Sequence, residues 1–218
     1  MKKLIVGNWK MNPDSLIKAE RLFKSFDIKT KNEVVLCPPF VFLKPGRNYK
    51  LGAQDCFYKE TGAFTGEVSP KMLKSLGCQY VIIGHSERRE IMKEKDVEIG
   101  KKVKEALKSK LKPILCVGEK KGEDRKIVIK RELKGIPDGI IIAYEPIWSI
   151  GTGKIPKMEE IEESFELIKK ISPKSKILYG GSVNGENIKN ILQVADGALI
   201  GGASLNVKEF IKIIKGCY

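Results

Sequence analysis

The chain has 218 residues, with 41 basic against 27 acidic side chains and a formal net charge of +14. With 42% hydrophobic residues it is too apolar for a disordered chain, and no run approaches the roughly 18 apolar residues of a membrane-spanning helix. A chain of this length can bury one substantial core, so we expect a single domain over residues 1–218 and no membrane partner.

The first ten residues, MKKLIVGNWK, begin like an export signal. Their apolar part stops at Val6, however, and no small-residue cleavage site follows. We therefore predict a first strand here, in a protein of the cytoplasm.

Short apolar runs of strand length continue along the chain. Uninterrupted hydrophobicity, in place of alternation, is expected of strands buried on both faces, which is the situation in parallel sheets. The runs cover residues 4–7, 34–37, 51–54, 80–83, 113–117, 139–144, 176–179 and 197–200.

Helical patterns lie between these runs. Ser69 before Pro70 is a helix start, and Glu159 with Glu160 places negative charge near the positive end of another helix. The apolar residues that we expect on helix faces are Ile99, Val103, Leu107 and Leu111, then Ile161, Phe165, Ile168 and Ile171, then Val207, Phe210, Ile211 and Ile214.

Eight strand-then-helix units without a long linker predict an α/β fold, a (β/α)₈ barrel of eight parallel strands ringed by helices. A doubly wound open sheet is the alternative architecture. It would need fewer strands and usually a glycine fingerprint after the first, but IVGNWKMN contains no Gly-x-Gly-x-x-Gly.

The five cysteines predict reduced thiols, because their number is odd and no Cys-x-x-Cys pair is present. With a single histidine, His85, no metal site is expected. Cys37 and Cys116 end apolar runs and are expected to be buried. The others are Cys56, Cys78 and Cys217.

The positive charge is spread beside glutamates along helical segments such as KKVKEALKSKLK. No basic stripe interleaved with aromatic residues appears, so we expect an anionic small substrate and no nucleic-acid partner, with a polyanion-binding role as the alternative. The abundance of lysine and glutamate is also typical of the ion-pair networks of a thermophile.

Polar residues follow several predicted strands. In a (β/α)₈ barrel the loops after the strands gather on one rim, so Asn8 and Lys10, His85 and Glu145 should converge there. Glu145 stands between an apolar run and a Pro-Ile-Trp turn, where partial desolvation would make the carboxylate a stronger base. Each residue also has a structural interpretation: a hydrogen-bonded imidazole, a surface lysine, a paired carboxylate.

Glycine pairs end the seventh and eighth runs, as Gly180-Gly181 followed by Ser182, and as Gly201-Gly202. Lacking Cβ atoms, they let backbone N–H groups approach an anion at a helix N-terminus, and barrels often bind phosphate at this place. Two tight turns are the alternative explanation.

A third glycine segment, WSIGTGKIP, follows Glu145. It is not a phosphate-binding P-loop, because Trp148 stands where the first glycine belongs and Ile155 follows Lys154. Pro146-Ile147-Trp148 and Lys154-Ile155-Pro156 are stiff flanks around a glycine-rich middle, and this pattern predicts a mobile lid. A base, an imidazole, a lysine, a phosphate cradle and a lid suit proton abstraction beside the carbonyl of a small phosphorylated substrate, without a cofactor.

Six segments in this order resemble the triosephosphate isomerase family from end to end: NWKMN, GAFTGEVS, GHSERR, AYEPIWSIGTGK, YGGSV and IGGASL. The resemblance implies interconversion of dihydroxyacetone phosphate and D-glyceraldehyde 3-phosphate, a step of glycolysis and gluconeogenesis. It implies Glu145 as the base, His85 as the group that polarises the carbonyl, and Lys10 as fixed positive charge. The substrate-binding residues that it implies are Asn8, Trp9, Lys10, Ile150, Gly151, Gly180, Gly181, Ser182, Gly201 and Gly202.

In this family the imidazole is kept neutral because it faces a helix N-terminus, and SERRE directly after His85 predicts a helix start. The chain also departs from the family. Only residues 120–140 separate LCVGE from IIAYE, and the second unit is short, so we expect shortened helices.

Compact members of this kind resemble the archaeal branch. A less covered barrel flank favours a tetramer, and the intact GAFTGEVS segment predicts at least a dimer. Another phosphate-binding barrel isomerase, or a catalytically silent polyanion-binding barrel, is the alternative function.

Overall fold

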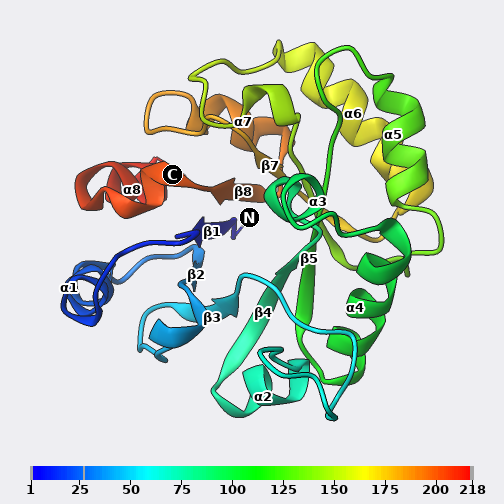
Figure 1. Cartoon of the computed structure of the whole chain (residues 1–218). Helices are drawn as coiled ribbons and strands as arrows, with labels where there is room; N and C mark the ends of the chain where they lie inside the picture. The colour runs from blue at the N-terminus through cyan, green and yellow to red at the C-terminus, as the bar shows by residue number, and fades with distance from the viewer. Residues whose placement is uncertain (1, 27, 217–218) are drawn as a thin grey trace.

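The computed structural model describes residues 2–26 and 28–216, and its eight parallel strands close into a barrel in chain order (Figure 1). Strand β1 pairs with both β2 and β8, so the ladder has no open edge. The strands are β1 (Leu4–Asn8), β2 (Glu33–Cys37), β3 (Lys50–Ala53), β4 (Cys78–Ile83), β5 (Lys112–Val117), β6 (Ile141–Tyr144), β7 (Lys176–Gly180) and β8 (Gly197–Ile200). Every predicted run overlaps a strand, and the (β/α)₈ prediction is confirmed.

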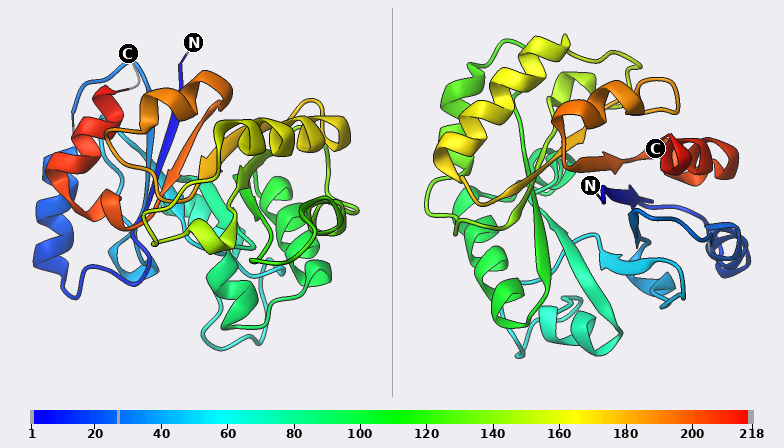
Figure 2. Two further views of the ribbon diagram at one scale, coloured as in Figure 1. Left: turned by 90° about the horizontal axis from the view of Figure 1, so that it is seen from above. Right: turned by 180° about the vertical axis from the view of Figure 1, so that it is seen from behind.

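The α-helices lie mainly around the outside of the barrel (Figures 1 and 2). They are α1 (Leu16–Phe26), α2 (Pro70–Ser75), α3 (Ser86–Glu90), α4 (Asp96–Lys108), α5 (Arg125–Glu132), α6 (Met158–Ile171), α7 (Ile188–Val194) and α8 (Val207–Lys215). The predicted cap of α2 is confirmed, because Ser69 Oγ accepts a hydrogen bond of 3.2 Å from the Met72 N–H. Glu159 and Glu160 lie in the first turn of α6, also as predicted.

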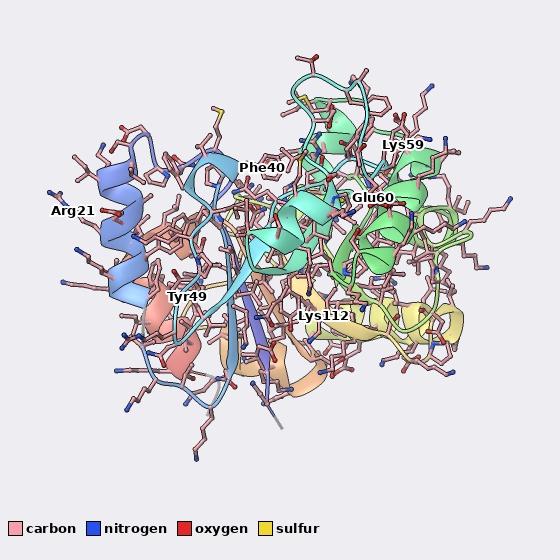
Figure 3. The ribbon with its side chains drawn as sticks, turned by 90° about the horizontal axis from the view of Figure 1, so that it is seen from below. Arg21, Phe40, Tyr49, Lys59, Glu60 and Lys112 are labelled. Carbon is pink, nitrogen blue, oxygen red and sulfur yellow. The ribbon has the colours of Figure 1, made fainter. Side chains whose placement is uncertain are left out.

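The second strand-then-helix unit, which was expected to be short, has no α-helix between β2 and β3. Only a 3₁₀ turn, Phe40–Phe42, lies between β2 and β3, since the segment is short and soon reaches Pro45 and Gly46. Tyr49 of this segment stacks on Phe23 of α1, with ring centroids 5.6 Å apart. Figure 3 shows Phe40 and Tyr49 here. The expected shortening of the fifth helix is confirmed, as α5 has 8 residues.

Three expected helix-face residues are placed differently. Leu107 and Ile171 stay about one-third exposed because they lie in the last turn of α4 and of α6. On α8 the buried face is made by Phe210, Ile213 and Ile214, and Ile211 is only partly buried.

One apolar cluster fills the barrel interior and another lies between strands and helices. Cys37, Cys56, Cys78 and Cys116 are buried free thiols, and Cys217 lies outside the described residues. No described helix has the length and apolar character needed to cross a membrane.

Side chains that fill the interior occupy every second strand position, as the period of a strand requires. In β1 these are Leu4 and Val6, and in β6 they are Ile141 and Ala143. The next positions in the same alternation are Asn8 and Glu145. The barrel core therefore directs these two polar residues to the carboxyl-terminal rim.

Candidate active site

A cavity of about 310 Å³ opens at the carboxyl ends of the strands, where the sequence predicted a site. It brings together most of the predicted residues, from both ends of the chain. These are Asn8, Lys10, His85, Glu145, Ile150, Gly151, Gly181, Ser182, Gly201 and Gly202.

Glu145 lies directly after β6 and is 5% exposed. Its backbone N–H donates to the Val117 carbonyl at 2.8 Å, which fixes the residue to β5. Within the described part of the chain, its Oε2 atom is buried and accepts no hydrogen bond. A buried carboxylate oxygen without a donor has an acceptor position that a bound molecule can use.

Two neighbours shape the space around this carboxylate. A Cβ on Gly180 would lie 2.5 Å from Glu145 Cγ, so only glycine leaves room for the side chain. Burial raises the pKa of the Cys116 thiol and the adjacent Glu145 carboxylate raises it further, so the sulfur stays protonated beside the base. The sequence had indicated Cys116 only as a core residue.

His85 is the N-cap of α3, which confirms the predicted helix start. Its Nδ1 atom accepts a hydrogen bond of 3.2 Å from the Glu87 N–H, so Nδ1 carries a lone pair and the ring proton is on Nε2. Nε2 lies 3.8 Å from Glu145 Oε2. This separation is too long for a direct hydrogen bond, so the two groups can both act on a substrate placed at the cavity floor.

Lys10 has a left-handed backbone, with φ of 53°. Two contacts hold this uncommon conformation: the Lys10 N–H donates to Asn8 Oδ1 at 3.0 Å, and Gln54 Nε2 donates to the Lys10 carbonyl at 2.8 Å. Lys10 Nζ pairs with Glu87 Oε1 at 2.6 Å. Sequence reasoning missed Glu87, although it lies inside GHSERR.

The segment predicted to be a lid begins with the 3₁₀ turn Ile147–Ser149, and Gly151 and Gly153 follow with positive φ angles of 71° and 75°. Trp148 at its base donates from Nε1 to Glu119 Oε1 at 3.4 Å. The Ser182 hydroxyl accepts from the Gly153 N–H at 2.9 Å and donates to the Ser149 carbonyl at 2.7 Å. Ser182 therefore ties the lid to the loop after β7.

Gly201 and Gly202, in the loop after β8, also line the cavity. A Cβ on Gly202 would meet nothing within 4 Å, and one on Gly201 would lie 3.2 Å from Lys10 Cε. The backbone here is open to the cavity and adjacent to a cation, which is the environment an anion requires.

Two predicted residues do not line the cavity. Trp9 is fully buried beside Phe23, with ring centroids 4.7 Å apart. The physical reason is alternation along the strand, since Asn8 faces the interior and the next residue faces the helices. Gly180 lies beneath the Glu145 side chain, as described above. The structure thus places both behind the site.

No group of three or more histidine, cysteine or acidic side chains within residues 2–26 and 28–216 is arranged to hold a metal ion.

A family model described as triosephosphate isomerase matches residues 3–217. Similar proteins named triosephosphate isomerase occur in Alkaliphilus oremlandii, at 44% identity over 98% of both chains, and in Ehrlichia chaffeensis, at 43% identity over 99% of this chain and 97% of the relative. Another, from Dehalococcoides mccartyi, is 45% identical over 97% and 95%.

The hydrogen bond at His85 Nδ1 predicts one imidazole tautomer. Because His85 is the only histidine, nitrogen-15 NMR of the folded protein at neutral pH should show one imidazole protonated at Nε2. His85→Gln should remove these signals and so assigns them. A ring protonated at Nδ1, or at both nitrogens, would contradict this geometry.

Proposed function

The chain belongs to the triosephosphate isomerase family, and on that premise we propose which residues carry its reaction. The reaction interconverts dihydroxyacetone phosphate and D-glyceraldehyde 3-phosphate through an enediolate. It is an intramolecular oxidation and reduction, in which one carbon of the substrate is oxidised as its neighbour is reduced. The observation that carries our assignment is the pair Glu145 Oε2 and His85 Nε2, 3.8 Å apart within one cavity.

In our proposal Glu145 removes a proton from the carbon beside the carbonyl and returns it to the neighbouring carbon. The C–H bonding electrons become the enediolate double bond, and the carbonyl oxygen gains negative charge. His85 donates a hydrogen bond from Nε2 to that oxygen and moves a proton between the two substrate oxygens. Neutral imidazole suits this exchange because it can both donate and accept.

Lys10 supplies positive charge near the developing oxyanion and the phosphate. That charge is paired with Glu87, so substrate binding must exchange a carboxylate partner for an anionic ligand. Asn8 supports this exchange by holding the Lys10 backbone in place.

We assign the phosphate to the backbone N–H groups of Gly181, Ser182, Gly201 and Gly202. Ile150 and Gly151 in the lid then cover the substrate. Exclusion of water strengthens the electrostatic contacts and protects an intermediate that can otherwise lose phosphate. The contact between Gly153 and Ser182 supports a lid that rests against the loop after β7.

We propose that the chain works as one catalytic unit over residues 1–218, without a cofactor, in the cytoplasm. A buried network supports the proposed thermophilic origin: Lys102 Nζ lies 2.8 Å from Asp55 and 2.6 Å from Glu94, and Arg88 Nε lies 2.9 Å and 2.6 Å from the same two carboxylates.

We further propose a tetramer of the compact, archaeal-type branch, built from dimers. Exposed apolar side chains on the loops after the first three strands, including Met11, Val41 and Phe64, support an interface. The missing second helix and the short α5 leave barrel strands that another subunit can cover.

Light scattering on the eluting protein should therefore give about four times the monomer mass of 24.4 kDa. A dimer mass at micromolar concentration would contradict the tetramer, and a monomer mass would contradict both assemblies.

Gly180→Ala tests the role of Glu145 without changing any titratable group. The new methyl group would collide with the Glu145 side chain and move the carboxylate, so kcat in a coupled assay with glyceraldehyde 3-phosphate should fall by about 100-fold. Gly100→Ala in α4, where a Cβ has ordinary contacts, is the matched control and should keep the activity of the unmodified protein. An active Gly180→Ala variant would contradict the assignment.

A further inference from the structure

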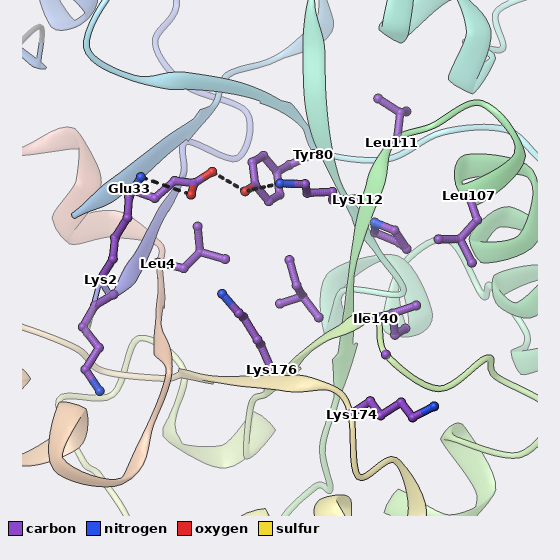
Figure 4. A pocket seen from close by; sticks show the side chains of 14 residues that line it. Lys2, Leu4, Glu33, Tyr80, Leu107, Leu111, Lys112, Ile140, Lys174 and Lys176 are labelled. Atoms are coloured by element: carbon purple, nitrogen blue, oxygen red, sulfur yellow. Dashed lines mark hydrogen bonds and ion pairs between the residues drawn. The ribbon is translucent and has the colours of Figure 1, made fainter. Parts of the chain in front are cut away.

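A second cavity, of about 370 Å³, lies at the opposite end of the barrel, where the strands begin (Figure 4). Residues from the start of β1, β2, β5, β6 and β7 line it. We propose that this amino-terminal mouth binds a small organic polyphosphate, of the nucleoside polyphosphate class. The proposal does not depend on the residue roles assigned to the isomerase site.

The strand alternation that forms the active site also forms this mouth. Leu4, Tyr80 and Ile141 belong to the cluster inside the barrel and make its floor at this end. Lys112 and Lys176 lie two residues before interior positions of their own strands, Ile114 and Leu178. Both lysines therefore extend from the barrel wall at the mouth.

The charges at this mouth are strongly unbalanced. Its lining contains five lysines and one acid, Glu33, with the lysines at positions 2, 3, 112, 174 and 176. Burial by itself raises the pKa of Glu33. A hydrogen bond from the Tyr80 hydroxyl and the nearby charges of Lys2 and Lys112 outweigh this effect and hold the pKa below its usual value. Glu33 is thus ionised at neutral pH, and one carboxylate faces several ammonium groups.

Most of the lysine groups have only weak or neutral partners. Lys3 Nζ donates to the Leu192 and Ala195 carbonyls, and Lys2 Nζ lies 3.5 Å from Glu33. Lys112 Nζ lies 3.4 Å from the Tyr80 hydroxyl. For Lys176 Nζ, no hydrogen bond or ion pair occurs among the described residues, and Figure 4 shows this amine directed into the cavity.

Like charges gathered in a concave site repel one another and concentrate a positive potential, which a multiply charged anion relieves. Such an anion can accept charge-assisted hydrogen bonds from Lys112 and Lys176 together. Glu33, the one carboxylate of the lining, lies near Lys2 and Lys112 and disfavours an anion directly beside it. The phosphates therefore belong on the Lys176 side of the cavity, and Lys112 would turn from the Tyr80 hydroxyl to reach them.

The rest of the lining is apolar and favours a ligand with a flat or apolar body. Leu107 is 38% exposed at this wall, and Ile140 and Pro113 lie beside it. The cavity volume is within the range of small-molecule sites. A base stacked against these side chains would bury them, and bare pyrophosphate would leave them in water.

Calorimetric titration of the full chain with ATP tests the proposal. ATP should bind the unmodified protein, and Lys112→Gln/Lys176→Gln should weaken binding by about tenfold or more, because two charged donors are lost. Lys189→Gln/Lys208→Gln removes the same charge from exposed positions on α7 and α8 and should bind like the unmodified protein. Pyrophosphate should bind more weakly than ATP, since it lacks the apolar body.

The active-site phosphate cradle needs a separate control. Gly202→Asp introduces a carboxylate into open space there, so it should weaken substrate binding and leave ATP binding intact. The Lys112→Gln/Lys176→Gln variant should in turn retain isomerase activity, which also shows that it is folded. Each of four results would overturn the proposal: no ATP binding to the unmodified protein, equal ATP binding by the two double-lysine variants, loss of ATP binding in Gly202→Asp, or equal affinity for pyrophosphate and ATP.

Discussion

Side chains on a barrel strand alternate between the interior and the surrounding helices, and this alternation determines what lies at each end of the molecule. Interior positions filled by Val6 and Ala143 lead, two residues later, to Asn8 and Glu145. On β5 and β7, Lys112 and Lys176 lie two residues before the interior positions Ile114 and Leu178, at the other mouth of the barrel. The same packing that closes the core therefore places Asn8 and Glu145 at one end and a group of cations at the other.

The rim that carries Glu145 and Lys10 contains two locally unfavourable features. Glu145 Oε2 is buried without a donor in the described structure, which costs about 1 to 3 kcal/mol or more for a charged group. Lys10 adopts a backbone conformation that is unfavourable for a side-chain-bearing residue. Both features are held by surrounding structure, namely Gly180 beneath the carboxylate and Gln54 beneath the lysine. In the proposed reaction, the substrate would supply the contact that Glu145 Oε2 lacks and would replace Glu87 as the partner of Lys10.

The sequence predicted the strands well because a strand buried on both faces leaves an uninterrupted apolar run. It also predicted most cavity residues, since residues after parallel strands meet on one rim. Trp9 was misplaced because a conspicuous motif was followed in preference to strand alternation. The second helix was expected from the repeat, although Pro45 and Gly46 argue against one.

Other features depend on contacts between distant residues and could not be found from one chain. The Lys10 and Glu87 side chains form an ion pair across 77 positions. Ser182 was assigned to phosphate, and only the folded lid shows its hydroxyl occupied by Gly153 and Ser149. The lysines that begin strands looked like ordinary surface charges until the barrel brought them to one mouth.

In the proposed reaction, Glu145 carries a proton between two carbons of the substrate. The most direct test is isomerisation of dihydroxyacetone phosphate in deuterium oxide, with the product trapped and examined by NMR. A carboxylic acid exchanges its proton with solvent, so product should carry deuterium on the carbon that receives the proton, and Glu145→Gln should form almost none. Product formed at the normal rate by Glu145→Gln would show that Glu145 is not the base.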